Sequence, residues 1–269
     1  MPDDDIAPIL SNKHHDLPSA FTPENLLREA RRQKSTTGEP VPNVCLLDPD
    51  GDIVQRLMTE GRAQRHTGWA CYHTDLYVFE EAGLTMGVVG CAVGASFAVL
   101  VAEELFASGC GLLISVTSSG QITPVQAPPY FILIDRALRD EGTSYHYLAP
   151  ARYSEAPEAL IGSLDGAFED LAVSVTRGAT WTTDAPFRET QEAIDAMRRE
   201  GLLAVEMEAA ALYAFARARD KAVVCFAHVT NQMGQIEGDF EKGDADGTTD
   251  ALSVVIGTAR RCLGNAEAT

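Results

Sequence analysis

The sequence is poor in positive charge. Its 269 residues contain 21 Lys and Arg against 39 Asp and Glu, which gives a formal net charge of −18. Proteins that bind nucleic acid neutralise phosphates with clustered Lys and Arg, whereas the densest basic run here is Arg31, Arg32 and Lys34. We therefore expect no nucleic-acid partner.

Long apolar runs are missing as well. The longest one, residues 84–105, is interrupted by Gly87, Gly90 and Gly94 and ends at Glu103 and Glu104, so it does not suit a membrane span. Residues 1–5 contain three acids and lack the apolar core of a secretory signal. We expect no membrane association and a cytoplasmic location.

The six cysteines form no metal or redox motif. They lie far apart in the sequence, with no Cys-x-x-Cys pair and no His at zinc-ligand spacing. A P-loop is also missing, and Gly87, Gly90 and Gly94 do not have the spacing of a dinucleotide-binding fingerprint. The sequence predicts a reduced protein without a metal or an organic cofactor.

The chain does contain regularly alternating strand and helix patterns. Apolar runs predict strands at 44–47, 84–89, 112–116, 130–133, 173–175, 202–205 and 222–229, and helical patterns predict helices at 52–61, 95–106, 190–200, 209–219 and 252–263. This alternation indicates an α/β fold, here a single three-layer α/β/α domain with a mixed, largely parallel central sheet over residues 43–269. Residues 1–42 form an N-terminal extension with one helix, which Thr22 caps. We expect loops at 117–120 and, exposed and acidic, at 238–249.

Two acids separated by one residue stand out in Glu206-Met207-Glu208, between a predicted strand and an Ala-rich predicted helix. Residues two apart in an extended chain point to the same face, so both carboxylates are expected to face one crevice at the strand end. A carboxylate accepts several hydrogen bonds and can bridge neighbouring hydroxyls, which suits the vicinal diol of ribose. The alternative is that these acids only stabilise the start of the helix through its dipole.

Residues 205–211, Val-Glu-Met-Glu-Ala-Ala-Ala, resemble the signature of the nucleoside phosphorylase/nucleosidase family, which includes uridine phosphorylase, purine nucleoside phosphorylase and methylthioadenosine nucleosidase. Residues 47–50 are similar to that family's Gly-Asp-Pro turn, and residues 139–146 resemble a segment of uridine phosphorylases. Residues 91–94 and 115–120 fall where the family has its Gly-rich and Arg-x-Gly-Thr-x-Gly loops. The resemblance extends over about residues 46–232 and implies a phosphorylase/hydrolase-like fold.

The resemblance also implies a ribosyl site. Glu208 would hold the ribose 2′ and 3′ hydroxyls, and the other implied groups near the sugar are Glu206, Met207, Cys91 and His15, the last in a neighbouring subunit's site. The implied base pocket consists of Phe187, Gln191 and Gln232, with an aromatic ring to stack on the base and amides to pair with it. Asn231 is the candidate catalytic group on the base side. The implied phosphate positions are Gly51, Ser115 and Ser118.

Several of these positions depart from the family pattern. Gly51 and Ser115 replace arginines that bind phosphate in relatives, and each lost charge-assisted hydrogen bond removes about 1.5–3 kcal/mol. Asn231 stands where purine-specific relatives have an Asp, and an amide cannot act as a general acid. Gln232 replaces an Arg of the pyrimidine relatives, so the sequence leaves the identity of the base open.

The leading hypothesis is an enzyme that cleaves the N-glycosidic bond of a nucleoside, with phosphate as the co-substrate that the resemblance implies. The alternatives are a nucleoside hydrolase that uses water, and a weakened member that binds a nucleoside as a sensor without turning it over. The resemblance further implies a homo-oligomer, either a dimer or a hexamer, and no cofactor.

Overall fold

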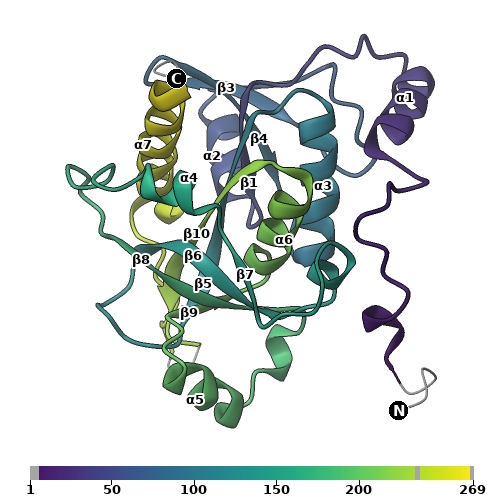
Figure 1. Cartoon of the computed structure of the whole chain (residues 1–269). Coiled ribbons are helices and arrows are strands. Elements are labelled where there is room, and N and C mark those ends of the chain that lie inside the picture. The colour runs from purple at the N-terminus through teal and green to yellow at the C-terminus, as the bar shows by residue number, and fades with distance from the viewer. Residues whose placement is uncertain (1–5, 234–236, 267–269) are drawn as a thin grey trace.

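A mixed sheet forms the centre of the protein, which we describe from a computed structural model for residues 6–233 and 237–266 (Figure 1). The strands are β1 (Val44–Asp48), β2 (Ala63–Arg65), β3 (Tyr77–Glu81), β4 (Leu84–Gly90), β5 (Leu112–Gln121), β6 (Tyr130–Asp140), β7 (Tyr153–Glu155), β8 (Val175–Thr183), β9 (Ala204–Glu206) and β10 (Ala222–Asn231). The α-helices are α1 (Pro23–Lys34), α2 (Asp52–Thr59), α3 (Ala95–Ala107), α4 (Glu158–Gly162), α5 (Gln191–Arg199), α6 (Ala209–Arg219) and α7 (Thr248–Ala266). Short 3-10 helices are η2 (Pro8–Leu10), η3 (Thr143–His146), η4 (Pro186–Arg188) and η5 (Asp244–Gly247).

Part of the sheet closes on itself. Strand β10 is parallel to β5 and antiparallel to β6, while β8 is parallel to both β6 and β9. Because β9 then pairs antiparallel with β5, the strands β5, β10, β6, β8 and β9 form a ring. From β5 the sheet continues through the parallel strands β1 and β4 to the antiparallel β3 and β2. The carboxyl ends of β1, β4, β5 and β10 therefore meet at one edge.

Helices cover both faces of this sheet. Helix α2 packs against α7, and α3 packs against α6, so that the two pairs form the outer layers (Figure 1). Helix α6 is buried from Ala209 to Ala216, and its small side chains allow it to lie between α3 and the strands. Helix α1 adds to the outside of α3, where Leu27 and Ala30 are buried with Ala70. Within residues 6–233 and 237–266, no helix combines the length and apolar character of a bilayer span.

The predicted α/β fold around a mixed sheet is confirmed. The sheet contains more antiparallel strand pairs than expected, because the strands β2, β3 and β7 were not predicted and pair antiparallel with their neighbours. Helix α6 has the predicted bounds, and Thr22 Oγ1 accepts a hydrogen bond from the Asn25 N–H at 3.3 Å as the expected cap of α1.

Three expectations were wrong. Residues 117–120 are not a loop but part of β5, because their backbone continues to pair with β10. The strand expected at 173–175 instead begins at Val175 and extends to Thr183. The loop 238–249 is not simply exposed, since it folds back with Asp239, Gly247 and Thr248 buried and with helix α7 already beginning at Thr248.

Candidate functional site

Chain segments that are distant in sequence meet where the parallel strands end. Asp48 is the last residue of β1, Cys91 follows β4, and Thr117 lies in the middle of β5, just beyond Ser115, where the pairing with β1 ends. The Cys91 N–H donates to the Asp48 carbonyl at 3.0 Å, which connects the ends of β1 and β4. The 206–208 segment joins them because β9 pairs with the end of β5. This is the edge at which open α/β sheets bind ligands.

Glu208 lies at the start of α6 and is only 1% exposed. Its Oε1 accepts a hydrogen bond from the Gly94 N–H at 2.7 Å, its Oε2 accepts one from the Met207 N–H at 3.3 Å, and the Thr117 side chain is a further partner. Burial, followed by the nearby Glu206 carboxylate, raises the pKa of Glu208 to about 8. The Glu208 side chain is therefore largely protonated at neutral pH, and hydroxyls that donate to it favour its charged form.

Glu206 has different surroundings. One of its oxygens accepts hydrogen bonds from the hydroxyls of Thr180, at 3.0 Å, and of Thr182. The other oxygen accepts from the N–H groups of Glu208 and Ala209, both at 2.7 Å. A carboxylate has about four acceptor positions, and these four contacts fill them. Glu206 thus fixes β8 to the start of α6, which leaves Glu208 as the member of the pair with capacity for a ligand.

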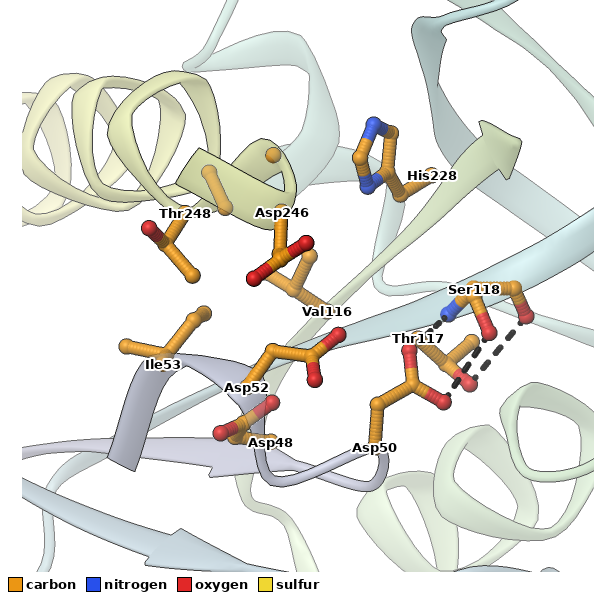
Figure 2. A pocket seen from close by; sticks show the side chains of 12 residues that line it. Asp48, Asp50, Asp52, Ile53, Val116, Thr117, Ser118, His228, Asp246 and Thr248 are labelled. Carbon is orange, nitrogen blue, oxygen red and sulfur yellow. Dashed lines mark hydrogen bonds between the residues drawn. The ribbon is translucent and has the colours of Figure 1, made fainter. Parts of the chain in front are cut away.

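One pocket is lined by four aspartates and is called the acidic pocket below (Figure 2). Asp48, Asp52 and Asp246 gather in it, while the Asp50 side chain extends to Ser118 (Figure 2). Its complete lining is Asp48, Asp50, Asp52, Ile53, Val116, Thr117, Ser118, His228, Asp246, Gly247, Thr248 and Ala251. Since Thr117 both lines the acidic pocket and contacts Glu208, the pocket and the Glu208 carboxylate are neighbours.

Two side chains of the acidic pocket have strongly shifted pKa values. Asp48 accepts hydrogen bonds from the N–H groups of Gly51 at 3.2 Å and Val54 at 3.0 Å, but burial outweighs them and raises its pKa to about 7. His228 stacks on Phe131 with ring centroids 4.3 Å apart. Burial and the nearby ammonium of Lys242 lower the pKa of His228 to about 4. The imidazole is therefore uncharged at neutral pH and does not balance the acids.

The three predicted phosphate positions are not equivalent in the structure. Ser118 lines the acidic pocket, whereas Ser115 lies inside β5, 1% exposed, between Leu47 of β1 and Cys225 of β10. Gly51 has a φ of +85°, and a Cβ added to it would lie 2.6 Å from the Cys91 Sγ. An arginine at position 51 would therefore require both a left-handed backbone and a displaced Cys91.

The predicted base-side residues lie at the ends of β8 and β10. The Phe187 side chain in η4 is 99% exposed, and Gln191 at the start of α5 donates to Asp195 at 2.9 Å. The Asn231 amide donates to the Thr230 hydroxyl at 3.1 Å and accepts from the Met233 N–H at 2.9 Å. Gln232 is exposed. None of these contacts joins the four side chains to one another.

The remaining predicted sugar-side residues have different surroundings. Met207 is half-buried beside Glu208, and Cys91 is exposed after β4 with a φ of +61°. His15 lies within hydrogen-bond distance of the Tyr145 carbonyl of the same chain, with its Nε2 3.1 Å from that oxygen. The site residues that the sequence did not reveal are Asp50, Asp52, Asp246 and His228. Their only signal was the acidity of residues 48–52 and 239–250.

Among the residues that the structure describes, no three His, Cys, Asp or Glu side chains are arranged to hold a metal ion. The acids of the pocket are instead satisfied partly by the protein. Lys242 pairs with Asp52, and Ser118 donates to Asp50.

Comparison with known proteins identifies the family. The family model described as the phosphorylase superfamily matches residues 44–261. Guanosine phosphorylase of Halorubrum lacusprofundi is 26% identical over 165 residues, which cover 61% of this chain and 67% of that protein. Uridine phosphorylase of Thermococcus kodakarensis is 29% identical over 181 residues, which cover 61% of this chain and 64% of that protein.

Solved structures show the same fold. Uridine phosphorylase from Vibrio fischeri, complexed with 6-hydroxy-1-naphthoic acid, superimposes with a TM-score of 0.68 at 20% identity, over 86% of this chain and 93% of the other. A second structure of uridine phosphorylase from that organism gives a TM-score of 0.66 at 21% identity, over 94% and 98%. With a family model that matches most of its length, the chain belongs to the phosphorylase superfamily.

Proposed function

We propose that the protein cleaves the N-glycosidic bond of a nucleoside and that Glu208 binds the 2′ and 3′ hydroxyls of its ribose. The observation that carries this proposal is the position of Glu208, a buried carboxylate at the carboxyl edge of the sheet next to the acidic pocket. Membership of the phosphorylase superfamily supports it, as do the two relatives, which are named for guanosine and uridine.

The proposed chemistry follows from charge. As the bond between the base and the anomeric carbon breaks, the sugar ring becomes positively charged, and a nearby carboxylate stabilises that charge most effectively where water is excluded. The two ribose hydroxyls donate to Glu208, which lowers its pKa from about 8 and favours the carboxylate form. Substrate binding and ionisation of Glu208 are thus coupled.

Glu206 supports this reaction through position. Its oxygens accept from the N–H groups of Glu208 and Ala209 at 2.7 Å, so it fixes the backbone on which Glu208 is mounted. Met207 lies between the two acids and is half-buried, which suits packing against the apolar face of a sugar.

The test is release of the free base by the purified full chain. Uridine, guanosine, inosine and adenosine are each incubated with the protein, alongside their 2′-deoxy analogues, and the bases are separated by chromatography. We expect release from at least one ribonucleoside and slower release from its 2′-deoxy analogue, because the latter offers Glu208 one hydroxyl instead of two.

Glu208→Gln is expected to lower base release by about 100-fold or more, as loss of a transition-state electrostatic contact does. The matched control is Glu158→Gln, the same change at an exposed position of α4, and it should retain the wild-type rate. Wild-type turnover by Glu208→Gln, or no base release from any nucleoside, would contradict the proposal.

A further inference from the structure

The Asp50 side chain binds both donors that Ser118 offers. Its Oδ2 accepts from the Ser118 N–H at 3.0 Å, and its Oδ1 accepts from the Ser118 hydroxyl at 2.9 Å (Figure 2). A backbone N–H and a hydroxyl of one residue that converge on two oxygens of one anion form a cradle for an oxyanion. In this protein the oxyanion comes from the chain itself.

We propose that Asp50 occupies the place of an external phosphate and that water, with Asp50 as its general base, attacks the anomeric carbon of the nucleoside. This inference rests on the proposed function and specifies its acceptor. The protein would then be a nucleoside hydrolase, although it belongs to a superfamily named for phosphorolysis.

The position of the Asp50–Ser118 pair relative to the sugar supports this assignment. Thr117, the residue before Ser118, lines the acidic pocket and also contacts the Glu208 carboxylate. A ribose whose hydroxyls are held by Glu208 therefore lies next to the wall that Asp50 and Ser118 form. The group that activates the attacking water is expected on this side of the sugar, where Asp50 and Ser118 lie.

The charges in the acidic pocket oppose phosphate. Asp48, Asp52 and Asp246 line it together with Asp50, while His228 is neutral at neutral pH because its pKa is lowered to about 4. Lys242, a cation near the pocket, pairs with Asp52. A phosphate dianion would meet several carboxylates at short range, each interaction unfavourable by Coulomb's law.

The three arginines that follow the 48–52 segment in the sequence have other partners. Arg56 binds Glu60 and the hydroxyls of Thr248 and Thr249 at 2.6–2.8 Å. Arg62 pairs with Glu60 and Glu81, and Arg65 pairs with Asp75. None of these three arginines is among the residues that line the pocket in the described part of the chain. The position where the sequence lacks an arginine, Gly51, is closed by Cys91.

The acidic pocket has room for a water molecule. The space open to the centre of a water-sized sphere is about 20 Å³, which is enough for one water. A water here would lie among carboxylate oxygens, which accept its hydrogen bonds and direct its lone pair away from themselves. In this proposal such a water attacks the anomeric carbon and transfers a proton to Asp50.

The proposed step balances as a hydrolysis. The water oxygen forms a bond to the anomeric carbon while the bond from that carbon to the base nitrogen breaks, and its electron pair leaves with the base. One proton of the water passes to the Asp50 carboxylate. The departing base takes up a proton from solvent, and Asp50 later returns its own proton to solvent, which gives free ribose and free base.

The first test does not depend on turnover. Inorganic phosphate is titrated into the wild-type protein in a calorimeter at constant ionic strength, with chloride as the reference salt. We expect no saturable heat, because Asp50 already holds the Ser118 donors. A saturable phosphate isotherm would overturn the proposal even if the protein proved inactive toward every nucleoside.

The second test uses two variants of one residue. Asp50→Asn keeps an oxygen for Ser118 but cannot take a proton, and Asp50→Ala leaves a space that a small carboxylate can enter. Removal of a general base lowers rates by about 10²–10⁴-fold, so both variants should lose at least about 100-fold in base release. Added formate should restore part of the rate of Asp50→Ala but not of Asp50→Asn, an effect that a merely structural role would not produce.

The control is Asp170→Asn, the same change at an exposed position, which should retain the wild-type rate. Wild-type base release is expected to be independent of phosphate concentration and to yield free ribose. Base release that requires phosphate would overturn the role of Asp50 while leaving the proposed glycosidic cleavage intact. Unchanged base release by Asp50→Asn would overturn it as well.

Discussion

The contacts of Glu206 predict that replacement by Ala lowers the stability of the protein more than replacement by Gln. Its carboxylate accepts from two backbone N–H groups at the start of α6, both at 2.7 Å, and from two threonine hydroxyls of β8. In Glu206→Ala the two N–H groups lose their acceptor inside the protein. A buried unsatisfied donor costs about 1–3 kcal/mol, so the free energy of unfolding should fall by about 2–6 kcal/mol.

Glu206→Gln should be milder. The amide oxygen can still accept from both N–H groups, and the amide nitrogen can donate to Thr180, whose hydroxyl is able to reverse its role. What is lost is the charge assistance, about 1 kcal/mol for each N–H, so the free energy of unfolding should fall by about 2 kcal/mol. Glu208→Gln should show a smaller effect, because the pKa of Glu208 is raised to about 8 and its side chain is already largely uncharged at neutral pH.

The assay is urea unfolding followed by tryptophan fluorescence. Trp181 is a suitable reporter because it lies between the two threonines on β8 and is 3% exposed. The surface variant Glu158→Gln should remain within about 0.5 kcal/mol of wild type. The reasoning is refuted if Glu206→Gln unfolds at the wild-type urea concentration, and more strongly if it keeps full stability yet loses turnover, since Glu206 would then contact the substrate.

Two further predictions concern pH and backbone geometry. Folded Glu208 keeps its proton up to about pH 8, whereas an unfolded Glu loses it near pH 4.3, so the free energy of unfolding should fall as pH rises between these values. Urea unfolding at several pH values checks this, and an equally steep fall in Glu208→Gln would contradict it. Gly51→Ala should cost about 1–3 kcal/mol because of the left-handed φ of +85° and the Cys91 contact. Urea unfolding of Gly51→Ala, alone and combined with Cys91→Ala, separates the cost of the backbone conformation from the cost of the Cys91 contact. Wild-type stability of Gly51→Ala would contradict the prediction.

The alternation of apolar segments was sufficient to predict the α/β fold and the centres of most strands. It failed where polar residues extend the strands, as in β8, whose Thr180 and Thr182 are buried because they donate to Glu206. A threonine in isolation gives no sign of such a partner, since Glu206 is more than 20 residues away in sequence. The lengths of β5 and β8 are therefore a consequence of tertiary pairing rather than of local pattern.

The candidate site was also predictable only in part, because tertiary contacts decide what its side chains bind. The spacing of Glu206 and Glu208 indicated two acids at a strand end, and both are there and buried. The acceptor positions of Glu206 are filled by protein groups because β9 pairs with both β5 and β8. The sequence pattern did not show this pairing. The hydrogen bonds between Asp50 and Ser118 join residues 68 positions apart. The negative net charge of the sequence does not show which acid makes such a contact.

The measurement that tests the central claim most directly follows the anomeric carbon itself. Ribonucleosides labelled with carbon-13 at that atom are incubated with the full chain in phosphate buffer, and the labelled resonance is observed over time by nuclear magnetic resonance. The account predicts that the nucleoside signal is replaced by the set of anomeric signals of free ribose, in wild type and not in Glu208→Gln. A nucleoside signal that persists unchanged with purine and pyrimidine substrates alike would contradict it.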